Sequence, residues 1–208
     1  NFKSTSILLE MARQQNSHFL FTSTAMVYGN HSGPFTEDMD KDPGNFYALT
    51  KSLSEDLILY FNKKFDVKST IFRPAVLYGP SQAGGFFVPT LINALSKNEE
   101  FEMTAGEQKR DFVYIVDFIN AIKLTIEKEA TGIFNIGSGN GVLIKDVAKT
   151  VEQKLGVKDK LQLGTLPYRD HEIWDYSLSS DKLHKETGWR ATISMGKGID
   201  LILKNMLE

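Results

Sequence analysis

Apolar side chains follow a helical period over much of the chain. Residues 3–15 place Ile7, Leu8, Met11 and Ala12 on one helical face. The same spacing of three and four residues predicts further helices at 46–64, within 86–97 after Pro89, and at 116–128, 143–155, 179–187 and 194–207. The stretch from 27 to 45 is rich in Gly, Pro, Asn and Asp, so we expect a loop there.

Short continuous apolar runs lie between these helical patterns. They predict buried strands at 18–24 and 132–137, with a further possible strand at 160–166. Within 68–80 they predict a strand that ends at Arg73 and Pro74 and runs into a loop stopped by Gly79 and Pro80. Strands that alternate with helices of this length indicate a parallel sheet covered on both faces, which is an α/β fold. In such sheets the chemistry lies at the carboxyl ends of the strands.

Composition narrows the class of protein. The chain has 208 residues, 41% hydrophobic and 24% charged, which suits one large domain or two small lobes. A net charge of −2 argues against a dedicated nucleic-acid binder, and no apolar run reaches the roughly 18 residues of a membrane span. The chain has no cysteine, which fits the cytoplasm, and its four histidines show no metal-ligand spacing, so we expect no metal.

A tyrosine and a lysine, Tyr47 and Lys51, are one helical turn apart in the predicted helix 46–64. A free phenol has a pKa of about 10, and a nearby ammonium group lowers it. The helix follows the strand that ends in Thr24, whose hydroxyl could bind the same substrate oxygen. Together these groups could move a proton on and off an alcohol. The alternative is an ordinary helix surface with an exposed lysine.

Several stretches resemble the extended short-chain dehydrogenase/reductases, in particular the NAD-dependent nucleotide-sugar epimerase/dehydratase family of the UDP-glucose 4-epimerase type. In the family's order they read FLFTSTAMVYG, YALTK, RPAVLYGP, GEQKRDFVYIVDF, FNIGSG, LPYR and LSSDKLHKETGW. The resemblance implies a Rossmann-like doubly wound parallel sheet with a smaller C-terminal α/β substrate lobe. It assigns residues 1–80 and 111–140 to the dinucleotide-binding domain, and 81–110 and 141–208 to the substrate lobe.

The resemblance also implies roles for individual residues. The catalytic set would be Thr24, Tyr47 and Lys51. Contacts to NAD or NADP would come from Thr22, Ser23, Tyr47, Lys51, Pro74, Ala75 and Val76. Contacts to a nucleotide-sugar would come from Thr24, Phe86, Phe87, Arg110 and Arg169, the arginines at the diphosphate and near the nucleotide. Tyr28 and Tyr114 are expected to be packing residues.

Departures from the family pattern limit the reaction. Ala25 and Met26 stand where the 4,6-dehydratases carry Asp and Glu, and decarboxylating members also place Glu at the Met26 position. Many members have Asn where Val76 stands in this chain, and UDP-glucose 4-epimerases often have another Asn near the position of Phe86. Epimerisation through a transient keto sugar is therefore the leading hypothesis. Ketone reduction, or a non-catalytic nucleotide-binding relative, is the alternative.

The glycine-rich turn that binds a dinucleotide is not found where the family has it. Only 46 residues precede Tyr47, and none of them forms G-x-x-G-x-x-G. The sequence GSGNG at 137–141 is expected to be a tight turn. We therefore interpret the chain as a C-terminal portion without the first βαβ units, inactive alone. We also expect a homodimer through helices 3–15 and 46–64.

Overall fold

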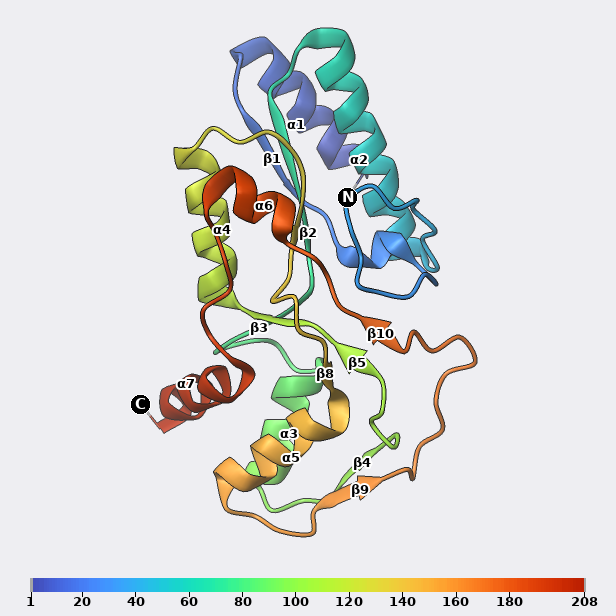
Figure 1. Cartoon of the computed structure of the whole chain (residues 1–208), viewed down its shortest axis with the longest axis vertical. Coiled ribbons are helices and arrows are strands. Elements are labelled where there is room, and N and C mark those ends of the chain that lie inside the picture. Colours follow the sequence, from blue (N-terminus) through green and yellow to red (C-terminus); the bar gives the residue numbers. More distant parts are fainter. Residues whose placement is uncertain (1, 208) are drawn as a thin grey trace.

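The computed structural model describes residues 2–207 (Figure 1). In chain order its elements are α1 (Phe2–Gln15), β1 (Phe19–Thr22), the 3₁₀ helix η1 (Ala25–Tyr28), α2 (Phe46–Phe65), β2 (Ser69–Pro74), β3 (Val76–Tyr78), α3 (Phe87–Ser96), β4 (Phe101–Met103), β5 (Lys109–Arg110), β6 (Phe112–Tyr114), α4 (Ile115–Glu127), β7 (Gly132–Ile136), β8 (Val142–Leu143), α5 (Ile144–Leu155), β9 (Leu161–Leu163), β10 (Asp175–Tyr176), α6 (Asp181–Thr187) and α7 (Met195–Leu207).

The main sheet is parallel, with the strand order β1-β2-β7. Successive side chains of a strand point to opposite faces, and β2 uses this period to fill two cores. Ile71 packs with Leu9 and Ile58 under α1 and α2, whereas Phe72 packs with Phe134 beneath α4 and α6. Helices therefore cover both faces of the sheet, as Figure 1 shows, and the predicted α/β fold is confirmed.

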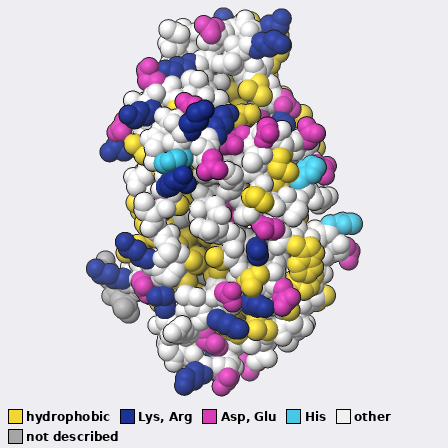
Figure 2. Space-filling model, viewed as in Figure 1, with side chains coloured by type: hydrophobic (Ala, Val, Ile, Leu, Met, Phe, Trp, Pro, Cys, Tyr) yellow, Lys and Arg dark blue, Asp and Glu magenta, His cyan; other side chains and the backbone are white. Residues whose placement is uncertain are grey.

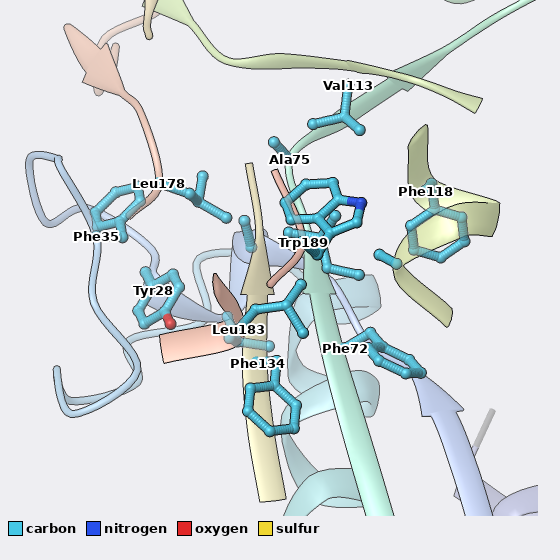
Figure 3. Packing of buried hydrophobic residues seen from close by; sticks show 14 of the residues in the cluster. Tyr28, Phe35, Phe72, Ala75, Val113, Phe118, Phe134, Leu178, Leu183 and Trp189 are labelled. Atoms are coloured by element: carbon cyan, nitrogen blue, oxygen red, sulfur yellow. The ribbon is translucent and has the colours of Figure 1, made fainter. Parts of the chain in front are cut away.

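The core beneath α4 and α6 is centred on Trp189. Figure 3 shows its indole ring between Phe118 and Leu178, with Leu183 close by. The indole Nε1 donates a hydrogen bond to the Asp117 carbonyl over 3.0 Å, so its one polar atom is satisfied inside the core. Residues far apart in the sequence thus pack onto the same face of the sheet.

A second group of elements lies at the lower end of Figure 1. Helices α3, α5 and α7 enclose an apolar core with the parallel pair β3-β6, and β4 pairs with β9 beside them. Helix α6 falls within the range expected for the substrate lobe, yet it packs against β7 of the main sheet. The division of the chain into the two predicted lobes stays a prediction.

The strand predicted to end at Arg73 and Pro74 is confirmed as β2, but the loop predicted after it contains β3, because the chain changes sheets at Ala75. The Ala75 amide donates to the Ile136 carbonyl of the main sheet over 2.9 Å, and the Val76 amide donates to the Asp111 carbonyl over 3.0 Å. The start of α3 also differs from the prediction, since the helix begins at Phe87. Pro89 then lies in the first turn, where a missing N–H costs nothing.

Acidic and basic side chains are interspersed over the face that Figure 2 shows. Apolar side chains gather between the upper and lower groups of elements on this face. Among residues 2–207, no helix combines the length and the apolar character that a membrane span requires.

Candidate active site

The first two turns of α2 carry Tyr47 and Lys51. The helix begins at Phe46 because the Asn45 side chain caps it, accepting a hydrogen bond from the Ala48 amide over 2.9 Å. Lys51 Nζ donates to the Thr22 carbonyl over 2.6 Å. This bond fixes the start of α2 against the carboxyl end of β1, so the predicted pair does lie at the edge of the sheet.

The Lys51 ammonium group lies between two aromatic rings. Its Nζ is 4.7 Å from the centre of the Phe21 ring and 5.9 Å from the centre of the Tyr47 ring. Burial lowers the pKa of Lys51, and the Glu55 carboxylate opposes this shift. Tyr47 itself is 47% exposed, so its phenol is accessible to a ligand.

Three hydroxyl-bearing residues, Thr22, Ser23 and Thr24, lie at and directly after the end of β1, and the structure gives each a different environment. The Thr22 carbonyl accepts from Lys51, whereas the buried Ser23 hydroxyl donates to Glu55. Thr24 caps η1, and its Oγ1 accepts from the Met26 amide over 3.2 Å. The Thr24 hydroxyl hydrogen thus remains available as a donor, as binding a substrate oxygen requires.

A buried ionic network lies directly behind this edge. Arg73 Nε and Nη2 donate to the two oxygens of Glu55 over 3.1 and 2.7 Å, and Arg73 Nη1 donates to the Tyr28 hydroxyl over 3.0 Å. Tyr28 in turn donates to Asn135 Oδ1 over 2.7 Å. Tyr28 and Tyr114 are both buried packing residues, as predicted. Glu55, which the sequence reasoning missed, is the centre of the network.

A cavity of about 610 Å³ opens beside η1 and the start of α2. Its size is that of sites for small molecules and cofactors. Its lining includes Met26 and Val76 near the strand ends, together with Arg110 and Arg169. Three predicted site residues are therefore brought to one cavity. Thr24, Tyr47 and Lys51 lie outside its lining, and so do Phe86 and Phe87 at the start of α3.

Residues 169–173 form a wall of this cavity, and two of them bind Arg110. The guanidinium Nη1 donates to the Lys109 and Ile173 carbonyls, each over 2.7 Å, and Nη2 forms an ion pair with Glu172. Burial of these groups is only partial, and the ring of Tyr176 lies 5.7 Å from the guanidinium carbon. Glu172 is a second residue that the sequence reasoning missed, since no period or motif pairs it with Arg110.

Backbone amides of the turn at 137–141 donate hydrogen bonds to a carboxylate of the protein itself. Asp111 accepts hydrogen bonds from the amides of Ser138, Gly139 and Leu178, over 2.8, 3.2 and 3.3 Å. Burial raises the pKa of Asp111, and these hydrogen bonds oppose the shift. The glycine-rich turn is thus a structural turn, as expected. Among residues 2–207, no group of three or more His, Cys, Asp or Glu side chains is arranged to hold a metal ion.

This combination defines a class: a parallel α/β protein in which Lys51 joins the start of the helix that carries Tyr47 to the carboxyl end of the strand before Thr24, beside a ligand-sized cavity. A model of the NAD dependent epimerase/dehydratase family matches residues 1–137, and the chain belongs to that family.

Relatives within the family differ in the reaction that their names describe. The chain is 30% identical over 193 residues to a dTDP-4-dehydro-6-deoxyglucose reductase of Escherichia coli, and 29% identical over 167 residues to a CDP-abequose synthase of Salmonella typhimurium. These matches cover 89% and 77% of the chain, which spans 60% and 56% of the two relatives.

Solved structures match the fold over almost the whole chain. A UDP-glucose 4-epimerase of Thermotoga maritima with UDP-glucose superposes with a TM-score of 0.90, at 27% identity over 98% of this chain and 69% of that one. A UDP-glucuronic acid 4-epimerase of Bacillus cereus, in complex with UDP-glucuronic acid and NAD, gives a TM-score of 0.91 at 26% identity, covering 100% and 68%. The Rossmann-like fold is therefore shown.

Proposed function

We propose that the protein epimerises a nucleotide-sugar, with Tyr47 as the acid/base at the reacting carbon. The hydrogen bond from Lys51 Nζ to the Thr22 carbonyl is the observation that carries this proposal. It holds the tyrosine, the ammonium group and the Thr24 hydroxyl at one edge of the sheet. These are the groups that proton transfer at an alcohol carbon requires.

Each residue has a separate part in the proposed reaction. Tyr47 takes the proton from a sugar hydroxyl, and the Lys51 ammonium group lies 5.9 Å from the centre of the Tyr47 ring. Thr24 donates a hydrogen bond to the same sugar oxygen. After the keto sugar turns over in the cavity, Tyr47 returns the proton to the oxygen, which then lies on the opposite face of the ring.

The donor set fits NAD or NADP. The bond to Thr22 uses one of the three hydrogens of the Lys51 ammonium group, so donors remain for the ribose hydroxyls. The chain would place Pro74, Ala75 and Val76 beside the nicotinamide. When bound, this cofactor exchanges hydride with the reacting carbon.

The two arginines of the cavity support a nucleotide-sugar as the substrate class. A guanidinium group binds phosphate oxygens in a fork, and Arg110 and Arg169 both line the cavity. A diphosphate would bind Arg110 in competition with Glu172. The sugar would then extend toward Thr24 and Tyr47.

A second candidate function is one-way reduction of a keto sugar that lacks a C6 hydroxyl. Met26 and Val76 make the cavity wall apolar close to the strand ends, where a deoxy position would be tolerated. Two of the relatives, the dTDP-4-dehydro-6-deoxyglucose reductase and the CDP-abequose synthase, support this candidate. In this reaction Tyr47 only donates its proton.

Substitution of Tyr47 by Phe tests the shared chemistry. In the protein expressed with any native sequence upstream of Asn1, we expect hydride transfer to fall by about 10²–10⁴-fold. Tyr60→Phe is the matched control, because Tyr60 also has a lysine four residues later and is 52% exposed, but lies nearly four turns farther along α2. Equal activities of the two variants would refute the role of Tyr47.

Products distinguish the two candidate reactions from a non-catalytic relative. An epimerase interconverts two nucleotide-sugars without net consumption of NAD(P)H, whereas a reductase consumes one NADPH or NADH for each keto sugar. No hydride transfer with any substrate, in a protein that still binds nucleotide-sugars, would favour the non-catalytic relative.

A nicotinamide cofactor titration addresses the chain itself. We expect weak or no binding and no turnover for residues 1–208, and tighter binding for a form that includes any native sequence upstream of Asn1. Tight binding by the 208-residue chain would contradict this expectation.

A homodimer and a cytoplasmic location complete the proposal. Ile7 and Leu8 on α1 and Leu49 and Leu53 on α2 are exposed apolar residues on two helices that contact each other. Burying them against a second copy would remove this surface from water. The absence of cysteine from all 208 residues supports the cytoplasm.

A further inference from the structure

The Ser23 hydroxyl and the Glu55 carboxylate form a buried hydrogen bond behind the candidate active site. Ser23 Oγ donates to Glu55 Oε1, while Arg73 donates to both oxygens of the same carboxylate. Glu55 is fully buried, and Ser23 and Arg73 are each 2% exposed. None of the three lines the adjoining cavity.

This hydrogen bond connects the two elements that carry the reacting groups. Ser23 directly precedes Thr24 at the end of β1, and Glu55 follows Lys51 by one turn of α2. The bond from Lys51 to the Thr22 carbonyl is a second connection between the same two elements. Two adjacent residues of the strand end are therefore each bound to α2, which fixes the position of Thr24 relative to Tyr47.

The composition of the network indicates a positional role. A buried ion pair gains little net stability over apolar residues of similar size, because both charges must be desolvated. A fully satisfied buried network does fix the geometry of its members. Burial alone would lower the pKa of Arg73, but its hydrogen bond to Glu55 raises it, so the guanidinium stays charged and keeps the carboxylate in place.

We propose that Glu55, held by Arg73, is a positioning residue that sets the separation of Thr24 and Tyr47 through the hydroxyl of Ser23. This inference rests on the proposed function, because it concerns the proton transfer at these two groups. Ser23 then contributes to the site through its side-chain bond to the interior and not as a ligand contact.

Ser23→Ala is the direct test, since it removes the connection without leaving a new buried charge. Ser54→Ala is the matched control: Ser54 is a fully buried serine of α2 that donates only to the Thr50 carbonyl of its own helix, over 2.8 Å. Ser23→Thr restores a hydroxyl. The variants are compared in the protein with any native upstream sequence, by kcat, KM and Tm.

We expect Ser23→Ala to lower kcat by about tenfold to a hundredfold, since small misplacements of reacting groups have effects of this size. KM should stay within about twofold, and Ser23→Thr should recover most of the loss, as expected when only transition-state geometry changes. The Tm loss should match that of Ser54→Ala, whose kcat is unchanged.

Two results would overturn the inference while leaving the proposed function intact. One is an unchanged kcat for Ser23→Ala, and the other is a raised KM for the cofactor with kcat unaffected, which would make Ser23 a ligand contact. An unsubstituted protein that transfers no hydride to or from any nucleotide-sugar would overturn the proposed function, and the inference with it.

Discussion

Replacing Arg73 by methionine should destabilise the fold strongly, because it leaves the Glu55 carboxylate buried without its main partner. Breaking a buried ion pair from one side costs about 3–5 kcal/mol. Here Glu55 would keep the hydroxyl of Ser23, and Lys41 Nζ is 3.7 Å from Oε2, so we expect the lower end of that range, about 3 kcal/mol. Glu55→Leu should cost at least as much, because it leaves the Arg73 guanidinium buried.

The double variant Arg73→Met/Glu55→Leu should be far more stable than the sum of the two single changes. Replacing both members of a buried ion pair by apolar residues is often close to neutral. The Ser23 hydroxyl would lose its acceptor, at about 1–3 kcal/mol. We therefore expect a total loss of about 1–3 kcal/mol in place of the sum of roughly 6 kcal/mol or more, a coupling of at least about 3 kcal/mol.

Urea unfolding, followed by tryptophan fluorescence and circular dichroism, measures all four proteins of this cycle. The slope of the free energy of unfolding against urea should stay constant, so that the midpoints report stability. Arg13→Met is a control for loss of a guanidinium group, because the Arg13–Glu10 ion pair lies on the surface of α1, and we expect little effect. Additive losses, with the double variant equal to the sum within about 0.5 kcal/mol, would refute the coupling.

Three further predictions concern other parts of the molecule. Burial lowers the pKa of Lys51 below 10.5, so on raising the pH the folded protein loses this proton before the unfolded protein does. The free energy of unfolding of the unsubstituted protein, relative to that of Lys51→Met, should therefore rise from pH 7 to pH 10 in urea unfolding. A constant or falling difference would contradict this. Gly198→Ala in α7 should lower the free energy of unfolding by about 1–3 kcal/mol in the same assay, because a Cβ would lie 2.1 Å from the Tyr78 hydroxyl oxygen. Gly196→Ala should raise it by about 0.5–1 kcal/mol, because the nearest atom to its Cβ would be 3.8 Å away. Leu53→Asp should convert the proposed dimer to a monomer in light scattering without a comparable loss of Tm, and an unchanged mass would count against the α1–α2 interface.

The regular elements were predictable because the apolar pattern carries them. Helices at 3–15, 46–64, 116–128, 143–155, 179–187 and 194–207 and strands at 18–24 and 132–137 all appear, with ends displaced by a few residues. The possible strand at 160–166 is confirmed as β9. In each case one set of side chains faces a core, and the spacing of that set reports the structure.

The elements that the sequence did not reveal are those without a period of their own. Strands β5, β8 and β10 have two residues each, too few for an alternation to be recognised. The sequence also gives no signal for the change of sheet at Ala75, since the residues directly before and after it, Pro74 and Val76, are both apolar and are buried or partly buried. The ion pair between Arg110 and Glu172 joins residues 62 positions apart, which no local pattern can indicate.

Helix α2 shows how one stretch of sequence can serve both the site and the core. Tyr47, Lys51 and Glu55 follow one another at intervals of four residues, and each interval exceeds one full turn by about 40°. The side chains therefore rotate progressively from the edge of the sheet toward the interior. Exposure follows this rotation, from 47% at Tyr47, through the half-buried Lys51, to zero at Glu55.

The same rotation explains why the three residues have different chemistry. The most exposed position carries the proposed acid/base, and the middle position carries a cation that lies near the ring of Tyr47 and binds the strand end. The buried position carries a carboxylate that only a buried partner such as Arg73 can stabilise. An acidic residue four positions beyond a Tyr-x-x-x-Lys pair, on the inward face of its helix, is thus a sequence signal for an anchor behind the site.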